Sequence, residues 1–222
     1  PSFPQHVDSA RGHEKSKDSI WTPVVTHHTV TIQGQTIRYT ATAGYLPVKD
    51  KAGKILARMF FIAYTKDGVT DNHDRPITYA FNGGPGSASV WLHMGAVGPR
   101  RVALDEKGLS PAPPYRLEDN NNSWLDQTDL VFIDPIPTGY SRAEPGVDAS
   151  QFHGYTNDIK SVGDFIRLYT TRYNRWSSPK FILGESYGTT RAAGLSGYLQ
   201  ETYNMYLNGI IMVSSVRDFQ TI

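Results

Sequence analysis

The feature that most constrains the fold is an apolar run that stops at a glycine-serine-glycine turn. Lys180 to Leu183 has the apolar character of a buried parallel strand and leads into Gly184-Glu185-Ser186-Tyr187-Gly188. Thr189 to Tyr203 then lacks proline and spaces its apolar side chains as a helix does. A strand that passes through Gly-x-Ser-x-Gly into a helix lifts the serine hydroxyl off the sheet in a strained backbone conformation. The segment therefore predicts that Ser186 is a nucleophile, with an inert serine on an ordinary strand-to-helix turn as the alternative.

The rest of the chain predicts an α/β fold with a mostly parallel sheet and helices on both faces. A length of 222 residues with 39% hydrophobic residues suits one sizeable domain. We expect residues 1–22, which are polar, to form a loosely ordered arm, and residues 23–222 to form the domain. Strands and helices alternate after this arm. The expected elements are a hairpin over 29–43 paired with 57–65, strands at 77–81, 130–133 and 207–213, and a helix over 156–173.

Composition excludes several classes of function. A net charge of +1 with interspersed signs gives no reason to expect a nucleic-acid or membrane-surface partner. The absence of cysteine excludes disulfides, thiolate catalysis and cysteine-ligated metal, and no apolar run approaches transmembrane length. We expect neither a cofactor nor a metal.

A second chemical signal is the glycine-rich turn Asn82-Gly83-Gly84-Pro85-Gly86, which follows the expected strand at 77–81. Acyl transfer through a serine needs donors aimed at the developing oxyanion, and glycine allows backbone amides to approach closely. An α/β-hydrolase takes one such amide from the residue after the nucleophile and one from the loop after its third strand. A phosphate-binding loop is the alternative, but the turn lacks a Lys-Ser/Thr ending and the dinucleotide glycine spacing.

Ordered motifs from about Ile77 to Val213 resemble the serine carboxypeptidase family. The resemblance implies an α/β-hydrolase fold and removal of C-terminal residues from peptides, typically at acidic pH. The motifs are Phe81-Asn82-Gly83-Gly84-Pro85-Gly86-Ser87-Ala88-Ser89, Gly98-Pro99, Asn122-Ser123-Trp124, Phe132-Ile133-Asp134-Pro135-Ile136-Pro137-Thr138-Gly139-Tyr140-Ser141 and Gly184-Glu185-Ser186-Tyr187-Gly188.

The same resemblance implies a role for each matching position. Ser186 resembles the nucleophile, and the amides of Gly84 and Tyr187 resemble the oxyanion hole. The family positions that bind the substrate's C-terminal carboxylate are matched here by Asn82, Gly83 and Glu185, so the resemblance implies this role for them.

The implied carboxylate-binding group has a physical consequence. The Glu185 carboxyl can face a substrate carboxylate only if the two share a proton, so activity should favour acidic pH. The alternatives are a solvated Glu185, and an Asn82 side chain bonded to its own backbone.

The chain departs from the family pattern beside the predicted site. Ala96 stands where the family often has a second carboxylate-binding glutamate, which makes strict carboxypeptidase specificity less secure. Ser87 stands where the family often has cysteine, so a disulfide of the relatives is absent. His93 also lies nearby, but a helix-borne histidine is more often packed or solvated than catalytic.

The largest departure is the missing general base. In an α/β-hydrolase the acid and the histidine of the triad follow the serine, but Asp218 is the only aspartate after Ser186 and all seven histidines precede it. A rearranged triad built on an earlier histidine is an alternative. We expect instead that the chain is one part of a larger enzyme, as a processed subunit or a shortened polypeptide. A second, noncovalently held chain would then supply the triad Asp and His, and the predicted strand Gly209 to Val213 would otherwise form an unpaired sheet edge.

Three functions remain open from the sequence. The first is a serine-type carboxypeptidase acting on peptides, and the second is an esterase or acyltransferase on the same scaffold. The third is a non-catalytic binding module that retains the turn at Ser186. The resemblance also implies a secreted or periplasmic location, because enzymes of this family usually enter the secretory or periplasmic route.

Overall fold

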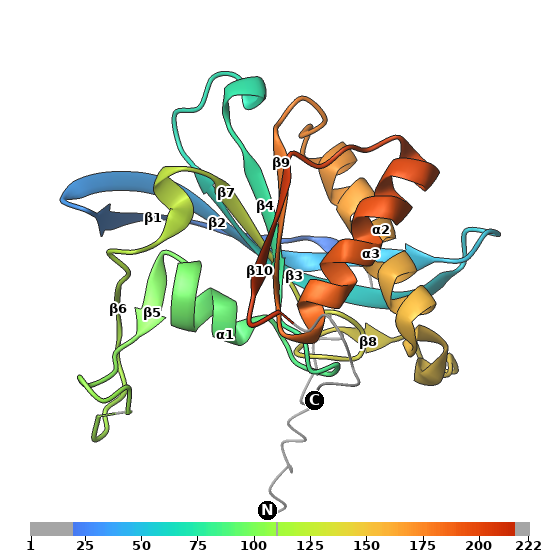
Figure 1. Cartoon of the computed structure of the whole chain (residues 1–222), viewed down its shortest axis with the longest axis horizontal. Coiled ribbons are helices and arrows are strands. Elements are labelled where there is room, and N and C mark those ends of the chain that lie inside the picture. Colours follow the sequence, from blue (N-terminus) through green and yellow to red (C-terminus); the bar gives the residue numbers. More distant parts are fainter. Residues whose placement is uncertain (1–19, 110, 216–222) are drawn as a thin grey trace, which may run out of the picture.

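A mixed β-sheet forms the centre of the molecule in the computed structural model, which describes residues 20–109 and 111–215 (Figure 1). The strand order is β1-β2-β3-β7-β4-β9-β10, with β8 paired to the amino-terminal part of β3. The strands are β1 (Val24–Ile32), β2 (Gln35–Lys49), β3 (Ile55–Lys66), β4 (Ile77–Phe81), β7 (Asp129–Ile133), β8 (Arg142–Ala143), β9 (Lys180–Glu185) and β10 (Gly209–Val213), and β5 (Arg100–Val102) pairs with β6 (Leu117–Asp119) in a separate ribbon.

The sheet changes from antiparallel to parallel along its width. β1, β2, β3 and β7 pair antiparallel, whereas β7, β4, β9 and β10 run parallel. The hairpin predicted over 29–43 is confirmed, but its strands are longer because β1 starts at Val24 and β2 continues to Lys49. Its turn residues Gln33 and Gly34 both have positive φ, as the tight hairpin turns of twisted strands require. Most of the predicted arm, residues 1–19, lies outside the described residues.

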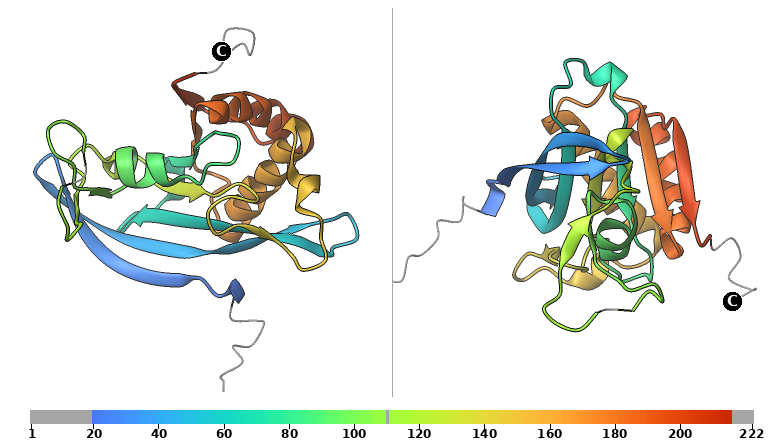
Figure 2. Two further views of the ribbon diagram at one scale, coloured as in Figure 1. Left: turned by 90° about the horizontal axis from the view of Figure 1, so that it is seen from below. Right: turned by 90° about the vertical axis from the view of Figure 1, so that its left-hand side faces the viewer.

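Helices cover both faces of the sheet (Figures 1 and 2). The long helices α2 (Tyr155–Arg172) and α3 (Tyr187–Tyr203) pack together on one face, and the short α1 (Val90–Leu92) continues as a π-helix (η3, His93–Val97) on the other. Within the part of the chain that the structure describes, no helix has the length and apolar character needed to cross a bilayer.

Alternate residues of the central strands supply two hydrophobic cores. Tyr79 of β4 packs with Phe165 and Leu195 of the long helices, while its neighbour Ala80 packs with Leu92 and other residues on the opposite face. Such alternation follows from the two-residue period of a strand. Because both faces are covered, β4, β7 and most of β9 are buried, as their apolar sequences predict.

A buried ionic cluster lies at the amino-terminal ends of the parallel strands. Asp129, the first residue of β7, accepts hydrogen bonds from Arg75 Nε (2.9 Å) and from Arg175. Arg75 also donates to the backbone carbonyls of Leu125 and Asp126. The cluster joins loops at the end of the sheet opposite to the carboxyl ends of β4 and β9.

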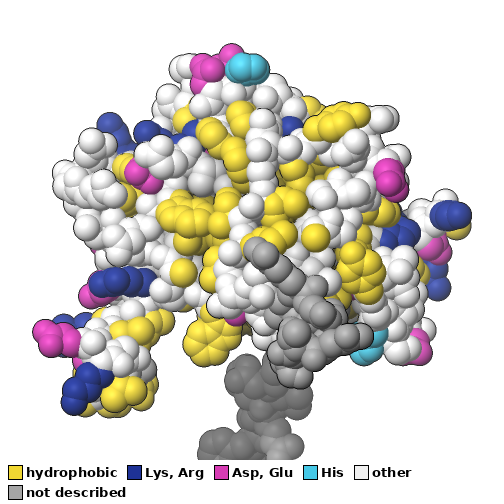
Figure 3. Space-filling view, in the orientation of Figure 1, with side chains coloured by type: hydrophobic (Ala, Val, Ile, Leu, Met, Phe, Trp, Pro, Cys, Tyr) yellow, Lys and Arg dark blue, Asp and Glu magenta, His cyan; other side chains and the backbone are white. Residues whose placement is uncertain are grey.

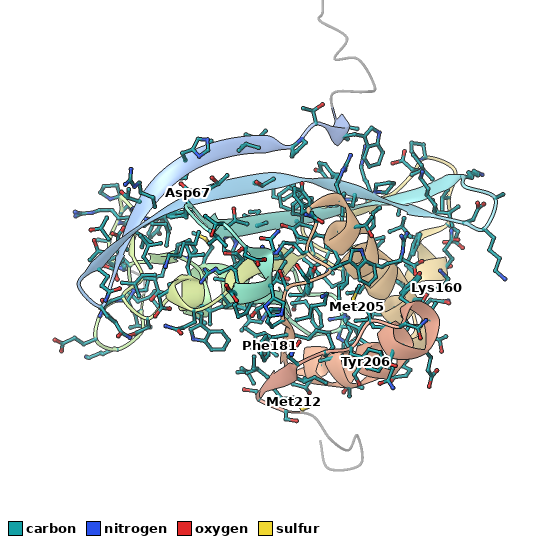
Figure 4. The ribbon with its side chains drawn as sticks, turned by 90° about the horizontal axis from the view of Figure 1, so that it is seen from above. Asp67, Lys160, Phe181, Met205, Tyr206 and Met212 are labelled. Carbon is teal, nitrogen blue, oxygen red and sulfur yellow. The ribbon has the colours of Figure 1, made fainter. Side chains whose placement is uncertain are left out.

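β10 is the outer strand on the parallel side of the described sheet. It pairs with β9 along one edge, and its side chain Met212 is 43% exposed. Figure 4 shows Met212 at the outer edge of the molecule, and Figure 3 shows hydrophobic side chains gathered on the face where β10 lies. The prediction of a sheet edge at Gly209–Val213 is confirmed for the described residues.

Candidate active site

Ser186 stands at the junction of β9 and α3. The predicted strand, turn and helix are confirmed: β9 ends at Glu185 and α3 starts at Tyr187. Ser186 adopts φ 55° and ψ −125°, a conformation that non-glycine residues rarely occupy. Its amide donates to the carbonyl of Val213 at the end of β10 (2.9 Å), so the sheet itself holds the strained residue in place.

The glycine-rich turn packs directly against this junction. It follows β4, the immediate parallel neighbour of β9. A Cβ atom on Gly83 would lie 2.7 Å from the carbonyl oxygen of Glu185 and 2.7 Å from the amide nitrogen of Gly188, so only glycine fits between them. Gly84 has a φ of +104°, which glycine tolerates and L side chains rarely adopt.

Two backbone amides are available to stabilise an oxyanion. The amide of Tyr187 is in the first turn of α3 and therefore has no acceptor within the helix. Within residues 20–109 and 111–215, the amides of Gly84 and Tyr187 donate to no protein acceptor. The positive end of the α3 dipole adds to the preference of the Tyr187 amide for negative charge.

Asn82 and Glu185 form a pair beside Ser186. The buried Asn82 donates from Nδ2 to Glu185 Oε2 (3.0 Å), and its Oδ1 accepts from the amide of Leu92 (3.1 Å). The Asn82 side chain is thus bonded across the site and not to its own backbone. Glu185 is half-buried and receives a protein hydrogen bond, which differs from the fully solvated carboxylate considered as an alternative.

These groups open into one cavity of about 480 Å³. Its lining includes Asn82, Gly84, Trp91, Ala96, Glu185 and Ser186. Trp91 is 71% exposed and stands on the wall of this cavity, a position that its sequence did not indicate. Four of the six predicted site residues and Ala96 thus line this cavity, whereas Gly83 and Tyr187 pack against each other beside it without being part of its lining. The chemical roles of all six stay predictions.

A second hollow, of about 340 Å³, lies on the other side of the glycine-rich turn. Pro85, Pro135, His153, Tyr187 and Arg191 contribute to its walls. Its lining is mainly apolar, so it offers space for a hydrophobic group next to Tyr187.

No described histidine lines the cavity that contains Ser186. Of the seven histidines, His6 and His13 lie outside the described residues, as does Asp218. His27 and His28 are on β1, His73 is on an exposed turn, and His153 faces the second hollow. Within residues 20–109 and 111–215, no histidine therefore shares this cavity with Ser186 as a general base of the family's kind would.

His93 is a packed histidine, as expected for its place on a helix. Its ring stacks on Phe132 with centroids 4.5 Å apart, and Nε2 lies 2.6 Å from the Tyr64 hydroxyl oxygen. Burial lowers the pKa of His93 from 6.5 to about 4, because the charged ring would lose its hydration. The neutral ring stabilises the π-helix that carries Ala96 to the cavity.

This depressed pKa predicts a loss of stability in acid. An unfolded chain protonates His93 as the pH falls below about 6.5, whereas the folded protein does so only near pH 4, so the free energy of unfolding falls between these values. The expected loss is about 3 kcal/mol. In denaturant titrations across this range, His93→Phe should show a weaker pH dependence than the wild type. His73→Gln, at an exposed ring, should behave like the wild type, and an unchanged dependence in His93→Phe would contradict the prediction.

Several residues that support the site were not singled out from the sequence. Asp134 accepts from the amides of Ser89 (3.0 Å) and Tyr140 (3.2 Å), which ties the loop after β7 to the segment after the glycine-rich turn. Burial raises the pKa of Asp134. Asn120 donates to the carbonyls of Ala96 (2.6 Å) and Gly98 (2.9 Å). Asp134 lies in one of the family-like motifs, and Asn120 lies two residues before another.

The mixed sheet, covered on both faces, and the strand-turn-helix at Ser186 place the protein in the α/β-hydrolase class. Within that class, the chain belongs to the serine carboxypeptidase family, whose model matches residues 32–216. The sequence-based identification of the family and of the fold is confirmed.

Similar proteins cover the chain to different extents. The pheromone-processing carboxypeptidase KEX1 of Saccharomyces cerevisiae is 33% identical over 156 residues, which are 65% of this chain and 20% of that protein. Serine carboxypeptidase-like 26 of Arabidopsis thaliana is 26% identical over 228 residues, covering 96% of this chain and 44% of that protein. The crystal structure of KEX1(delta)P, a prohormone-processing carboxypeptidase from the same yeast, superposes with a TM-score of 0.63 at 24% identity, over 78% of this chain and 38% of that one. The chain thus spans less than half the length of each of these relatives.

Proposed function

We propose that this chain carries the nucleophilic half of a serine-type carboxypeptidase. The observation that carries the proposal is the Asn82–Glu185 pair in the same cavity as Ser186. A serine and two free amides suit any acyl transfer, but a carboxyl and a carboxamide beside them suit a substrate that ends in a carboxylate.

Each predicted residue then has a step in the reaction. The Ser186 hydroxyl attacks the carbonyl carbon of the last peptide bond, and the amides of Gly84 and Tyr187 donate to the oxyanion. The peptide C–N bond breaks, the leaving amine takes a proton from the general acid, and water later hydrolyses the acyl ester on Ser186. Asn82, Gly83 and Glu185 hold the terminal carboxylate, with one proton shared between it and Glu185, so that binding strengthens in acid.

We propose that the Asp and His of the triad come from residues outside this sequence, on a further segment or on a noncovalently bound second chain. The cavity of Ser186 has no histidine among the described residues, and β10 has an exposed edge at which another strand could pair. We also propose a secreted or periplasmic location. The proposal is supported by the yeast relative KEX1, which is named as a pheromone-processing and as a prohormone-processing carboxypeptidase.

The test compares substrates that differ only at the C-terminus. For the full gene product at acidic pH, an N-blocked dipeptide with a free carboxylate should have a kcat/KM about 10 to 100 times that of its C-terminal amide or ester. The reason is that the amide and the ester lose the hydrogen bonds that the protein donates to the charged carboxylate. Ala96→Glu should widen this preference. Equal rates on the ester and the free acid would favour an esterase or acyltransferase, a reading that the absence of a carboxyl at Ala96 supports. No reaction with a fluorophosphonate probe would favour the non-catalytic module.

A further inference from the structure

Arg191 is a buried cation close to the nucleophile that no step of the proposed reaction uses. It lies in the second turn of α3 and is only 2% exposed. Its guanidinium stands 5.1 Å from the ring centre of Phe81 and 5.2 Å from that of Tyr187. Because burying a guanidinium carries a large desolvation penalty, its hydrogen-bond partners indicate what holds it there.

Those partners join three segments of the fold. Nε donates to Oδ2 of Asp158, a buried residue in the first turn of α2, at 2.8 Å. Nη1 donates to the backbone carbonyl of Asn82 at 2.9 Å. Asp158 thus fixes the guanidinium, and the guanidinium fixes the first peptide group of the glycine-rich turn.

The direction of one carbonyl determines the direction of the next amide. In a planar trans peptide, the carbonyl of Asn82 and the N–H of Gly83 point in opposite directions. With the carbonyl held on the Arg191 side, the N–H of Gly83 points away from that side. The neighbouring contacts of the Asn82 side chain, to Leu92 and Glu185, fix the carboxamide but leave this peptide group to Arg191.

We propose that Arg191, held by Asp158, is a positioning residue that orients the Gly83 amide for the terminal carboxylate of the substrate. The inference rests on the proposed function. It predicts a larger effect on the binding of free-acid peptides than on the chemistry at Ser186, because Arg191 bonds the peptide group that contains the Gly83 amide and touches Tyr187 only through its ring.

The main test is the double variant Arg191→Met with Asp158→Asn, which removes both charges so that neither is left unpaired. In the full gene product, KM for the free-acid dipeptide should rise about tenfold with little change in kcat, and KM for the ester should stay within about twofold. Arg191→Lys is the alternative if the double variant fails to fold. A lysine keeps a charge for Asp158 but lacks the fork that binds two acceptors, so it should show the same selective rise in KM.

A matched control separates positioning from stability. Arg75 is likewise buried, bonds to an aspartate and to backbone carbonyls, and lies at the opposite end of the strands. Arg75→Met should lower the melting temperature yet leave the ratio of free-acid to ester KM values unchanged. The inference is overturned if the Arg191 variants lower stability without changing this ratio, or if Arg75→Met changes it equally.

A second readout does not depend on activity. In protein labelled with ¹⁵N-glycine, the Gly83 amide resonance should shift and exchange faster with solvent in the Arg191 variants than in Arg75→Met. If the wild type does not prefer free acids but this resonance responds, the proposed function fails while the positioning by Arg191 stands. An unchanged Gly83 resonance would overturn the positioning itself.

Discussion

Replacement of Ser186 by alanine is expected to lower kcat for peptide hydrolysis by at least about 10⁴-fold and to abolish fluorophosphonate labelling. Without the hydroxyl no acyl-enzyme can form, whereas the amides of Gly84 and Tyr187 and the Asn82–Glu185 pair remain in place. Substrate affinity should therefore change little. The measurement is steady-state hydrolysis of the free-acid dipeptide by the full gene product, together with mass spectrometry of the labelled protein.

Two further variants make this expectation specific. Ser196→Ala, at a hydroxyl that donates to the carbonyl of Ala193 on the same helix, should keep full activity and labelling. Ser186→Gly should also be inactive, but it should raise the free energy of unfolding by about 1 kcal/mol because glycine relieves the strain at φ 55°. Labelling of Ser186→Ala at the wild-type rate would show that another residue is the nucleophile.

Replacement of Gly83 by alanine is expected to damage both stability and catalysis. The added methyl group would meet the carbonyl of Glu185 and the amides of Tyr187 and Gly188, all of which are backbone atoms. Relief of the overlap must separate the glycine-rich turn from the start of α3. We expect a loss of about 3 kcal/mol in the free energy of unfolding and, because an oxyanion donor is displaced, a fall in kcat of about 10² to 10³.

The matched control is Gly197→Ala, a glycine in the interior of α3 where a Cβ atom would meet nothing within 4 Å. It should stabilise the protein by up to about 1 kcal/mol, since alanine favours the helix, and leave kcat unchanged. Thermal unfolding and steady-state kinetics on both variants give the comparison. A folded, fully active Gly83→Ala protein would contradict the close packing of the two turns.

The sequence predicted those parts of the fold in which local pattern and burial agree. The apolar runs at Ile77–Phe81 and Lys180–Glu185, each followed by a glycine-containing turn, are strands that end at the site. The helix expected over 156–173 is present at Tyr155–Arg172, because its apolar residues repeat at helical spacing against the sheet. The sequence placed His93 on a helix but gave no bounds for α1 and its π-helical continuation, since so few residues carry no periodic signal.

Contacts between distant segments could not be predicted from the sequence without the family resemblance. Nothing in the local sequence of Asp158 or Arg191 indicates that they meet beneath the glycine-rich turn. Arginine is rarely buried in proteins, so the sequence alone favours an exposed position for Arg191 on α3. Likewise, Trp91 lines the Ser186 cavity because of the direction in which α1 follows the glycine-rich turn, and the spacing of Trp91 from other aromatic residues does not indicate this.

The pairing of β4 with β9 has a consequence for the timing of synthesis. Asn82 and Glu185 are 103 residues apart, and a ribosome adding 5 to 20 residues per second needs about 5 to 20 s to cover that distance. During this interval the buried strand Ile77–Phe81 has emerged but lacks β9 on one side. A nascent chain in this state exposes an apolar strand edge to other nascent chains, so we expect aggregation to compete with folding most strongly at that stage of translation.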